Sequence, residues 1–415
     1  MVLRVLREVS VDEHGVEHSI RLGAKSAAKK IFADMFGPVI MLLLGGFSIA
    51  AALSKQNIAK SLAAAVLGRA GSKPVWVLLA NMFVSTFSSM WISNVAAPVL
   101  CFSLISPILR NLPPKSNYAK ALIIGIALAA NVGGMASPIA SPQNVIAMGI
   151  MQPSPSWLEW FAIAIPISIV LDLAIWGLII AVYQPGDQGT SVPEIASHST
   201  VDKFNWKQYF VIFITCFTIL LWCLESQIEN IIGDMGVIAI FPILAFFGTG
   251  ILTKDDWNSM LWSVVVLAMG GISLGKAVES SGLLKNLTSQ IVPYLSELPL
   301  FYCLILFSTI VLVIASFISH TVGALILLPV ISQVGMSLPD PEPRILVMAA
   351  ALMCSGAMGL PVSSFPNMNA ISLDGPTGVP WLTVADFLKV GLFSSLIALA
   401  VVLFIGYPIM RLIGF

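Results

Sequence analysis

Small polar residues gather at four points inside otherwise apolar stretches of the chain. Two points are Ser93-Asn94 and Ser319-His320-Thr321, and the other two, at 137–141 and 363–367, contain proline. Hydroxyls, amides and freed backbone N–H groups suit a compact oxyanion, whereas freed carbonyls suit a small hard cation. The sequence therefore predicts one binding site near the bilayer midplane, built from Ser88, Ser89, Ser93, Asn94, Ser137, Ser141, Ser316, Ser319, His320, Thr321, Ser363, Ser364 and Asn367.

Two titratable residues lie in apolar surroundings. His320 occupies the position in the second polar break that Asn94 occupies in the first. Because imidazole titrates near neutral pH, His320 could take a proton or donate to an anion oxygen. Asp172 lies inside the apolar segment 157–183, where a carboxyl group usually faces the protein interior. We expect a structural partner for Asp172 rather than a substrate contact.

The composition is that of a membrane protein. Hydrophobic residues make up 57% of the 415 residues and charged residues 10%, against about 25% charged in soluble domains. A chain this apolar is expected in the lipid bilayer. The 21 acidic and 21 basic side chains balance, so the net charge points to no nucleic acid as a partner. The five cysteines form no CxxC pair, and GxSxG, HExxH and paired catalytic carboxylates are absent. We therefore expect neither an enzyme nor a cofactor.

The apolar segments predict an all-α polytopic fold. A helix needs about 20 mostly apolar residues to cross a bilayer, and plain spans are expected at 35–54, 157–183, 206–224, 235–252, 259–275 and 385–412. Segments 74–110 and 298–337 are long and carry a polar break in the middle, which favours re-entrant hairpins. Segments 121–150 and 345–373 are dense in glycine and proline, which predicts two broken helices.

These units occur twice. Gly45 aligns with Gly270, Asn94 with His320, and Asn144 with Asn367, at offsets of 225, 226 and 223 residues. Nearly constant offsets across three motifs indicate an internal duplication. We expect the end of a preceding helix and a polar loop at 1–34, repeat 1 at 35–150, connecting helices and a polar loop at 151–234, repeat 2 with its preceding helix at 235–375, and a C-terminal helix at 376–415.

Charge predicts that the copies are inverted. No acid lies between 35 and 158, which holds Lys55, Lys60, Arg69, Lys73, Arg110, Lys115 and Lys120. Around the second hairpin Glu279, Glu297, Asp340 and Glu342 outnumber Lys276, Lys285 and Arg344. Since basic residues favour the cytoplasmic side, the hairpins should open to opposite sides, as in inverted-repeat transporters.

The motifs at the breaks carry a resemblance to a known family. Ser93-Asn94-Val95 with Ser141-Pro142-Gln143-Asn144, and Ser319-His320-Thr321 with Ser364-Phe365-Pro366-Asn367, resemble the paired motifs of the divalent anion/sodium symporter family. The strings MFGPVIMLLLGGFSIAAALSK, SSMWISNVAAPVL and SHTVGALILLPV resemble its fungal low-affinity phosphate transporters. The resemblance covers residues 30–413 and implies that the chain lacks the family's leading helices, as an N-terminally truncated member would.

The resemblance implies a homodimer with an elevator mechanism, in which the hairpins and broken helices move against a scaffold. It implies a phosphate site from Asn94, Ser141, His320, Thr321 and Ser364. It also implies a sodium site at Ser89, Ser93 and Asn94 with the carbonyl of Ala140, and Ser363 as the corresponding cation ligand in the second repeat. Val95, His320 and Ala315 replace a threonine, an asparagine and a hydroxyl residue of the family pattern, so sodium and proton both stay open as the coupling ion.

The sequence thus predicts a secondary transporter of inorganic phosphate coupled to a cation, in the plasma membrane or the vacuolar membrane. A dicarboxylate or sulfate symporter on the same scaffold and an uncoupled anion channel are the alternatives.

Overall fold

The computed structural model describes residues 6–11, 17–68, 71, 73–113, 116–185, 204–283, 286, 289–290, 293, 295, 298–375 and 378–415. Of the charges used to orient the repeats, Arg69, Lys115, Lys285 and Glu297 lie outside the described residues.

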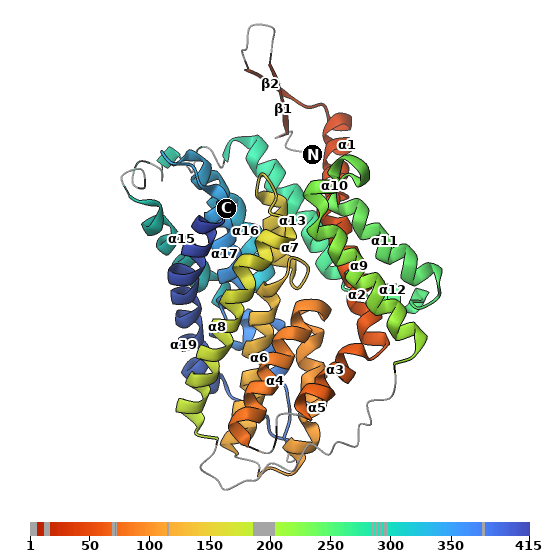
Figure 1. Cartoon of the computed structure of the whole chain (residues 1–415). Coiled ribbons are helices and arrows are strands. Elements are labelled where there is room, and N and C mark those ends of the chain that lie inside the picture. Colours follow the sequence, from red (N-terminus) through yellow and green to blue (C-terminus); the bar gives the residue numbers. More distant parts are fainter. Residues whose placement is uncertain are drawn as a thin grey trace.

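The described chain is nearly all helical (Figure 1). Outside the repeat motifs the helices are α1 (Ala24–Met35), α2 (Pro38–Lys55), α3 (Ile58–Leu67), α8 (Trp157–Tyr183), α9 (Trp206–Cys223), α10 (Glu225–Ile232), α11 (Met235–Gly248), α12 (Lys254–Asn258) and α13 (Trp262–Ser281). The segment 1–34, expected as a helix end and a polar loop, instead contains an antiparallel hairpin of β1 (Arg7–Val11) and β2 (Glu17–Arg21), followed by α1. Its alternation of polar and apolar residues was too short to be read as strands.

Both predicted broken units are present in each half. In the first half α4 (Pro74–Ile92) and α5 (Ala96–Arg110) form the interrupted pair, and α6 (Asn117–Ala136) and α7 (Pro142–Ile150) form the broken helix. In the second half the pair is α15 (Leu300–Phe317) and α16 (His320–Ser337), and the broken helix is α17 (Pro343–Gly356), the 3-10 helix η1 (Pro361–Ser363) and α18 (Phe365–Ile371). The breaks are confirmed, while the re-entrant path, the inverted orientation and the elevator movement stay predictions.

Helix α6 forms the centre of the molecule. Of its residues, all but Asn117 and Lys120 are buried, and α4, α5, α8, α17 and α18 pack around it. Small residues allow this close packing, as they do in other membrane helices. At Gly133 a Cβ atom would clash with the backbone oxygen of Thr86 on α4. The helix that leads to the first break is therefore fixed on several sides.

The remaining helices flank this centre. In Figure 1, α9 and α11 lie beside α2 on one side, and α15 and α19 (Val384–Val401) lie on the other, with α6 and α7 between them. The chain ends with the π-helical turn η2 (Val402–Gly406) and α20 (Tyr407–Leu412), which continue α19.

Eight helical segments of the described chain are long and apolar enough to cross a membrane. Large apolar side chains such as Phe213, Phe317 and Phe404 are exposed along these helices, as expected where lipid is the solvent. The chain is an integral multi-pass membrane protein.

Candidate functional site

A small cavity lies where the four breaks meet. It is lined by Phe47, Ser93, Asn94, Val95, Ala140, Pro142, Gln143, Leu261, Val264, Ser319, His320, Thr321, Ser363, Ser364 and Phe365. These residues come from both interrupted pairs, both broken helices, α2 and the start of α13 with the residue before it. The volume of about 20 Å³ holds roughly one water molecule, so the site has little free space in this conformation.

The first tip is held by its backbone. The N–H of Asn94 donates to the carbonyl oxygen of Ala140 at 3.4 Å, which connects the α4–α5 tip to the break after α6. Ser93 ends α4 with φ 107° and ψ 148°, a conformation that is rare outside glycine, and its Oγ accepts the N–H of Val95 at 3.2 Å. This strained turn places the Asn94 side chain against the cavity.

Ser141 lies beside Asn94. A Cβ atom added to Gly134 would lie 2.8 Å from Oγ of Ser141 and 3.2 Å from Nδ2 of Asn94. Oγ of Ser141 is buried and has no hydrogen-bond partner, although buried hydroxyls are nearly always paired. The absence of a side chain at Gly134 thus leaves room for two polar groups, one of which can still bind a ligand.

His320 begins α16 and anchors the second tip. Its Nε2 lies 3.0 Å from the carbonyl oxygen of Ala357, at the break after α17. Since a carbonyl only accepts, Nε2 carries the hydrogen, and Nδ1 of the neutral ring is an acceptor. Nδ1 is buried without a hydrogen-bond partner. Beside it, Oγ of Ser319 accepts the N–H of Val322 at 3.3 Å and caps the helix.

Asn144 and Asn367 support the two breaks in the same way. Nδ2 of Asn144 donates to the carbonyls of Gly134 and Ser137 at 2.7 and 2.8 Å. Nδ2 of Asn367 donates to those of Met358 and Leu360 at 3.1 and 3.0 Å. Both amides satisfy carbonyls that an interrupted helix leaves free. The aligned asparagines are thus supports of the breaks.

The structure brings most of the predicted site residues together. Ser93, Asn94, Ala140, His320, Thr321, Ser363 and Ser364 line the cavity, and Ser141 adjoins it. Ser89 does not line it; its Oγ donates to the carbonyl of Ala130 at 2.7 Å, one turn before the tip. Ser137 and Ser316 bond to the carbonyls of Met90 and Leu312.

Gln143 was missed by the sequence reasoning. It lines the cavity, and its Nε2 donates to Oγ of Ser355 at 2.8 Å, which joins the two repeats. Its place in the Ser-Pro-Gln-Asn stretch was the available signal. The apolar wall formed by Phe47, Leu261, Val264 and Phe365 had no signal, because such residues look like ordinary span residues.

The expected structural partner of Asp172 is Thr86, whose Oγ1 lies 2.6 Å from Oδ2 of the carboxyl group. Asp172 lies on α8, outside the cavity lining.

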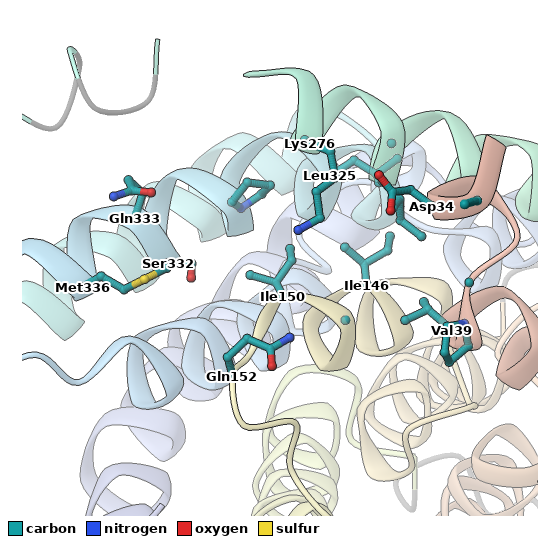
Figure 2. A pocket seen from close by; sticks show the side chains of 18 residues that line it. Asp34, Val39, Ile146, Ile150, Gln152, Lys276, Leu325, Ser332, Gln333 and Met336 are labelled. Carbon is teal, nitrogen blue, oxygen red and sulfur yellow. The ribbon is translucent and has the colours of Figure 1, made fainter. Parts of the chain in front are cut away.

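A second, larger cavity of about 400 Å³ lies along the other ends of the same helices. Figure 2 shows Asp34 of α1, Val39 of α2, Ile150 of α7, Lys276 of α13 and Gln333 of α16 around it. Because α7 and α16 begin at the small cavity and run along the large one, the two spaces lie along the same pair of helices.

The electrostatics of the small cavity suit an anion without fixed charges. No Asp, Glu, Lys or Arg is among its lining residues. The N-termini of α5, α7 and α16 lie at it, and each presents unpaired N–H groups and a partial positive charge of about half a unit. Together with amide and hydroxyl groups, these can bind an oxyanion reversibly.

Comparisons with known proteins agree with this architecture. An uncharacterized transporter of Schizosaccharomyces pombe is 52% identical over 413 residues, which cover 100% of this chain and 46% of the relative. The inorganic phosphate transporter PHO87 of Saccharomyces cerevisiae is 46% identical over 410 residues, 98% of this chain and 44% of the relative. The chain thus spans about half the length of these relatives. The crystal structure of the YdaH transporter of Alcanivorax borkumensis shares the fold with a TM-score of 0.59 and 15% identity, covering 100% of this chain and 95% of that one.

A family model described as a citrate transporter, CitMHS, matches residues 18–351. This match and the relatives confirm the resemblance to anion transporters that the motifs at the breaks carry. The chain belongs to the CitMHS citrate transporter family of membrane transporters.

Proposed function

We propose that this protein is a secondary active transporter of inorganic phosphate coupled to a cation. The observation that carries the proposal is the convergence of four helix breaks on one small cavity that is lined by Asn94, His320 and Ser364. A site formed by interrupted helices at a repeat interface is typical of alternating-access transporters. The relative PHO87, named as an inorganic phosphate transporter, supports the choice of substrate.

Phosphate binding is assigned to Asn94, Ser141, His320, Thr321 and Ser364. Amide and hydroxyl donors and the N-termini of α5, α7 and α16 stabilise the phosphate oxygens. Nδ1 of neutral His320 is an acceptor, and at neutral pH phosphate keeps a P–OH group that can donate to it. Sulfate keeps none, so this nitrogen favours phosphate over sulfate.

The coupling cation is sodium or a proton. For sodium the ligands are the oxygens of Ser89, Ser93 and Asn94 with the carbonyl of Ala140, and Ser363 is the counterpart in the second repeat. Neutral hydroxyl, amide and carbonyl oxygens are suitable ligands for a hard cation. A cation bound next to the phosphate would offset part of the charge of the anion.

The larger cavity between α1, α2, α13 and the pair α7 and α16 fits an access route to the small cavity. In an elevator mechanism, α4–α7, with α6 at the centre, and α15–α18 would move against a scaffold that includes α2, α9 and α11. A homodimer would hold that scaffold. In this proposal the boundaries between the repeats and the segments that flank them lie at residues 34, 150, 234 and 375.

The test is phosphate uptake into liposomes that contain the purified chain, with sodium and pH gradients imposed separately. Uptake driven by at least one gradient and inhibited by arsenate more than by succinate is expected. Uptake that depends on neither gradient would identify a channel instead. Stronger inhibition by succinate than by arsenate would identify a dicarboxylate carrier.

A further inference from the structure

Asp172 has no role in the proposed anion site, yet it is fully buried in the middle of α8. Its Oδ2 lies 2.6 Å from Oγ1 of Thr86, and its Oδ1 has no hydrogen-bond partner. The same Thr86 oxygen lies 3.0 Å from the carbonyl oxygen of Ala129 on α6. Three oxygen atoms thus form a short chain between α8, α4 and α6.

The hydrogens available to these three oxygen atoms determine whether the carboxyl group of Asp172 is protonated. A carbonyl only accepts, so the contact between Thr86 and Ala129 is a hydrogen bond only when the single hydrogen of the Thr86 hydroxyl points to Ala129. The contact between Thr86 and Asp172 then needs a hydrogen on the carboxyl group. An ionised Asp172 would take the Thr86 hydrogen as its only donor and would keep Oδ1 unpaired. Because a buried charge in that state is strongly unfavourable, such groups bind a proton instead.

The surroundings offer no cation to replace that proton. The elements that pack most closely on α8 are α4, α6, α9, α19, α20 and η2, and α17 reaches α8 through the ion pair of Arg344 with Glu159. Helix α4 and η2 contain no titratable residue. The others carry Tyr118 and Lys120 on α6, Lys207, Tyr209, Cys216 and Cys223 on α9, Asp386 and Lys389 on α19, and Tyr407 and Arg411 on α20. Lys120 pairs with Asp386, and Arg411 pairs with Glu342. None of the ion pairs found among the described residues includes Asp172.

We propose that Asp172 is a proton-binding site whose occupancy is coupled to the first hairpin tip through α4. Thr86 lies about one turn before Ser89 and two turns before Ser93 on the same helix. Loss of the proton would turn the Thr86 hydroxyl from Ala129 toward the carboxylate. This removes one of three side-chain hydrogen bonds from α4 to α6, the others being Ser85 to Ile126 at 2.8 Å and Ser89 to Ala130 at 2.7 Å.

The proposal deepens the proposed function, on which it rests, by naming the proton as a coupling ion. The proton path from solvent would reach Asp172 only when α4 and α8 separate, because the carboxyl group is fully buried in this structure. Proton exchange is therefore expected at one stage of the transport cycle.

The first test measures the proton itself and does not depend on phosphate. Infrared difference spectra between the purified chain and Asp172→Asn should contain the carbonyl stretching band of a protonated carboxyl group. In Thr86→Val the band should persist and move to higher frequency, because the hydrogen bond is lost. Spectra of the chain and of Asp172→Asn without such a difference would overturn the proposal. If Asp172→Asn cannot be purified in a folded form, the test is the frequency of the band in Thr86→Val. The same frequency in Thr86→Val and in the unmodified chain would contradict the proposal.

The second test measures coupling. Asp172→Asn imitates the permanently protonated state, so phosphate uptake should persist but lose its stimulation by an imposed pH gradient. Asp255→Asn, an exposed acid on α12, is the matched control and should respond like the unmodified chain. An unchanged gradient response in Asp172→Asn would overturn the coupling. If the unmodified chain transports no phosphate, the proposed function fails. The infrared measurement still tests the protonation of Asp172, because it does not depend on phosphate.

Discussion

The backbone N–H of Asn94 donates to the carbonyl oxygen of Ala140, which ties the first hairpin tip to the break that follows it in the chain. In the second repeat His320 makes the corresponding connection, from its imidazole Nε2 to the carbonyl of Ala357. Each tip is thus anchored to the broken helix of its own repeat, once through the backbone and once through a side chain. The first connection leaves the Asn94 side chain available, and the second leaves Nδ1 of His320 available.

Replacing Asn94 with alanine should abolish phosphate uptake with little loss of folded protein. The backbone connection to Ala140 does not need the side chain, whereas anion binding does. Uptake and the thermal midpoint in detergent are the two measurements. Asn258→Ala, at an exposed position of α12, should change neither, and full uptake by Asn94→Ala would remove Asn94 from the site.

Two substitutions of His320 separate its two nitrogens. Glutamine can place a donor near the Nε2 position and keep the bond to Ala357, but it has no acceptor at the Nδ1 position. Asparagine keeps an acceptor near Nδ1 and loses the bond to Ala357. Selectivity is the ratio of two inhibitions of labelled phosphate uptake, by unlabelled phosphate and by sulfate. This ratio should therefore fall in His320→Gln and persist in His320→Asn.

The thermal midpoint should change in the opposite order, with His320→Asn the less stable variant. Selectivity that falls in both variants, or in neither, contradicts the assignment of Nδ1. A changed pH profile of uptake that is equal in both variants would instead indicate that the imidazole itself carries a proton.

Replacing Gly134 with alanine should weaken phosphate binding at least about tenfold, because the new Cβ would displace Ser141 and the Asn94 amide. The matched control is Gly177→Ala on α8, where a Cβ atom meets nothing within 4 Å. That change should leave binding intact and stabilise the helix by up to about 1 kcal/mol. Equal affinities for phosphate in the two variants would show that the space at Gly134 does not matter.

Replacing Asn367 with alanine should reduce stability rather than selectivity. The amide satisfies the carbonyls of Met358 and Leu360 and accepts from Asn131 at 2.9 Å. Leaving a buried polar group unpaired costs about 1–3 kcal/mol, so the thermal midpoint in detergent should fall clearly below that of Asn258→Ala. An unchanged midpoint would mean that the break is held by other contacts.

Much of the architecture could be predicted because bilayer-length apolar runs and interruptions are visible in the sequence. The breaks after Ile92, Ala136 and Gly356 were marked by polar residues or by glycine and proline. The N-terminal hairpin was not predicted, since its five-residue strands are too short to show a pattern.

The site was predictable in part for the same reason. Asn94 and His320 stand out as polar residues in apolar runs, and both line the cavity. The alignment of Asn144 with Asn367 was visible, but only the hydrogen bonds show that these amides support carbonyls. The role of Gly134 could not be seen either, because it depends on which side chains face it in space.

Direct binding of radiolabelled phosphate to the purified chain is the measurement that tests the central claim, because it needs neither orientation in a membrane nor a gradient. Binding should be saturable, and arsenate should displace the phosphate better than succinate does. Asn94→Ala should lose this binding, and Asn258→Ala should keep it. No saturable binding, equal binding in the two variants, or stronger displacement by succinate would contradict a phosphate site at the meeting point of the four breaks.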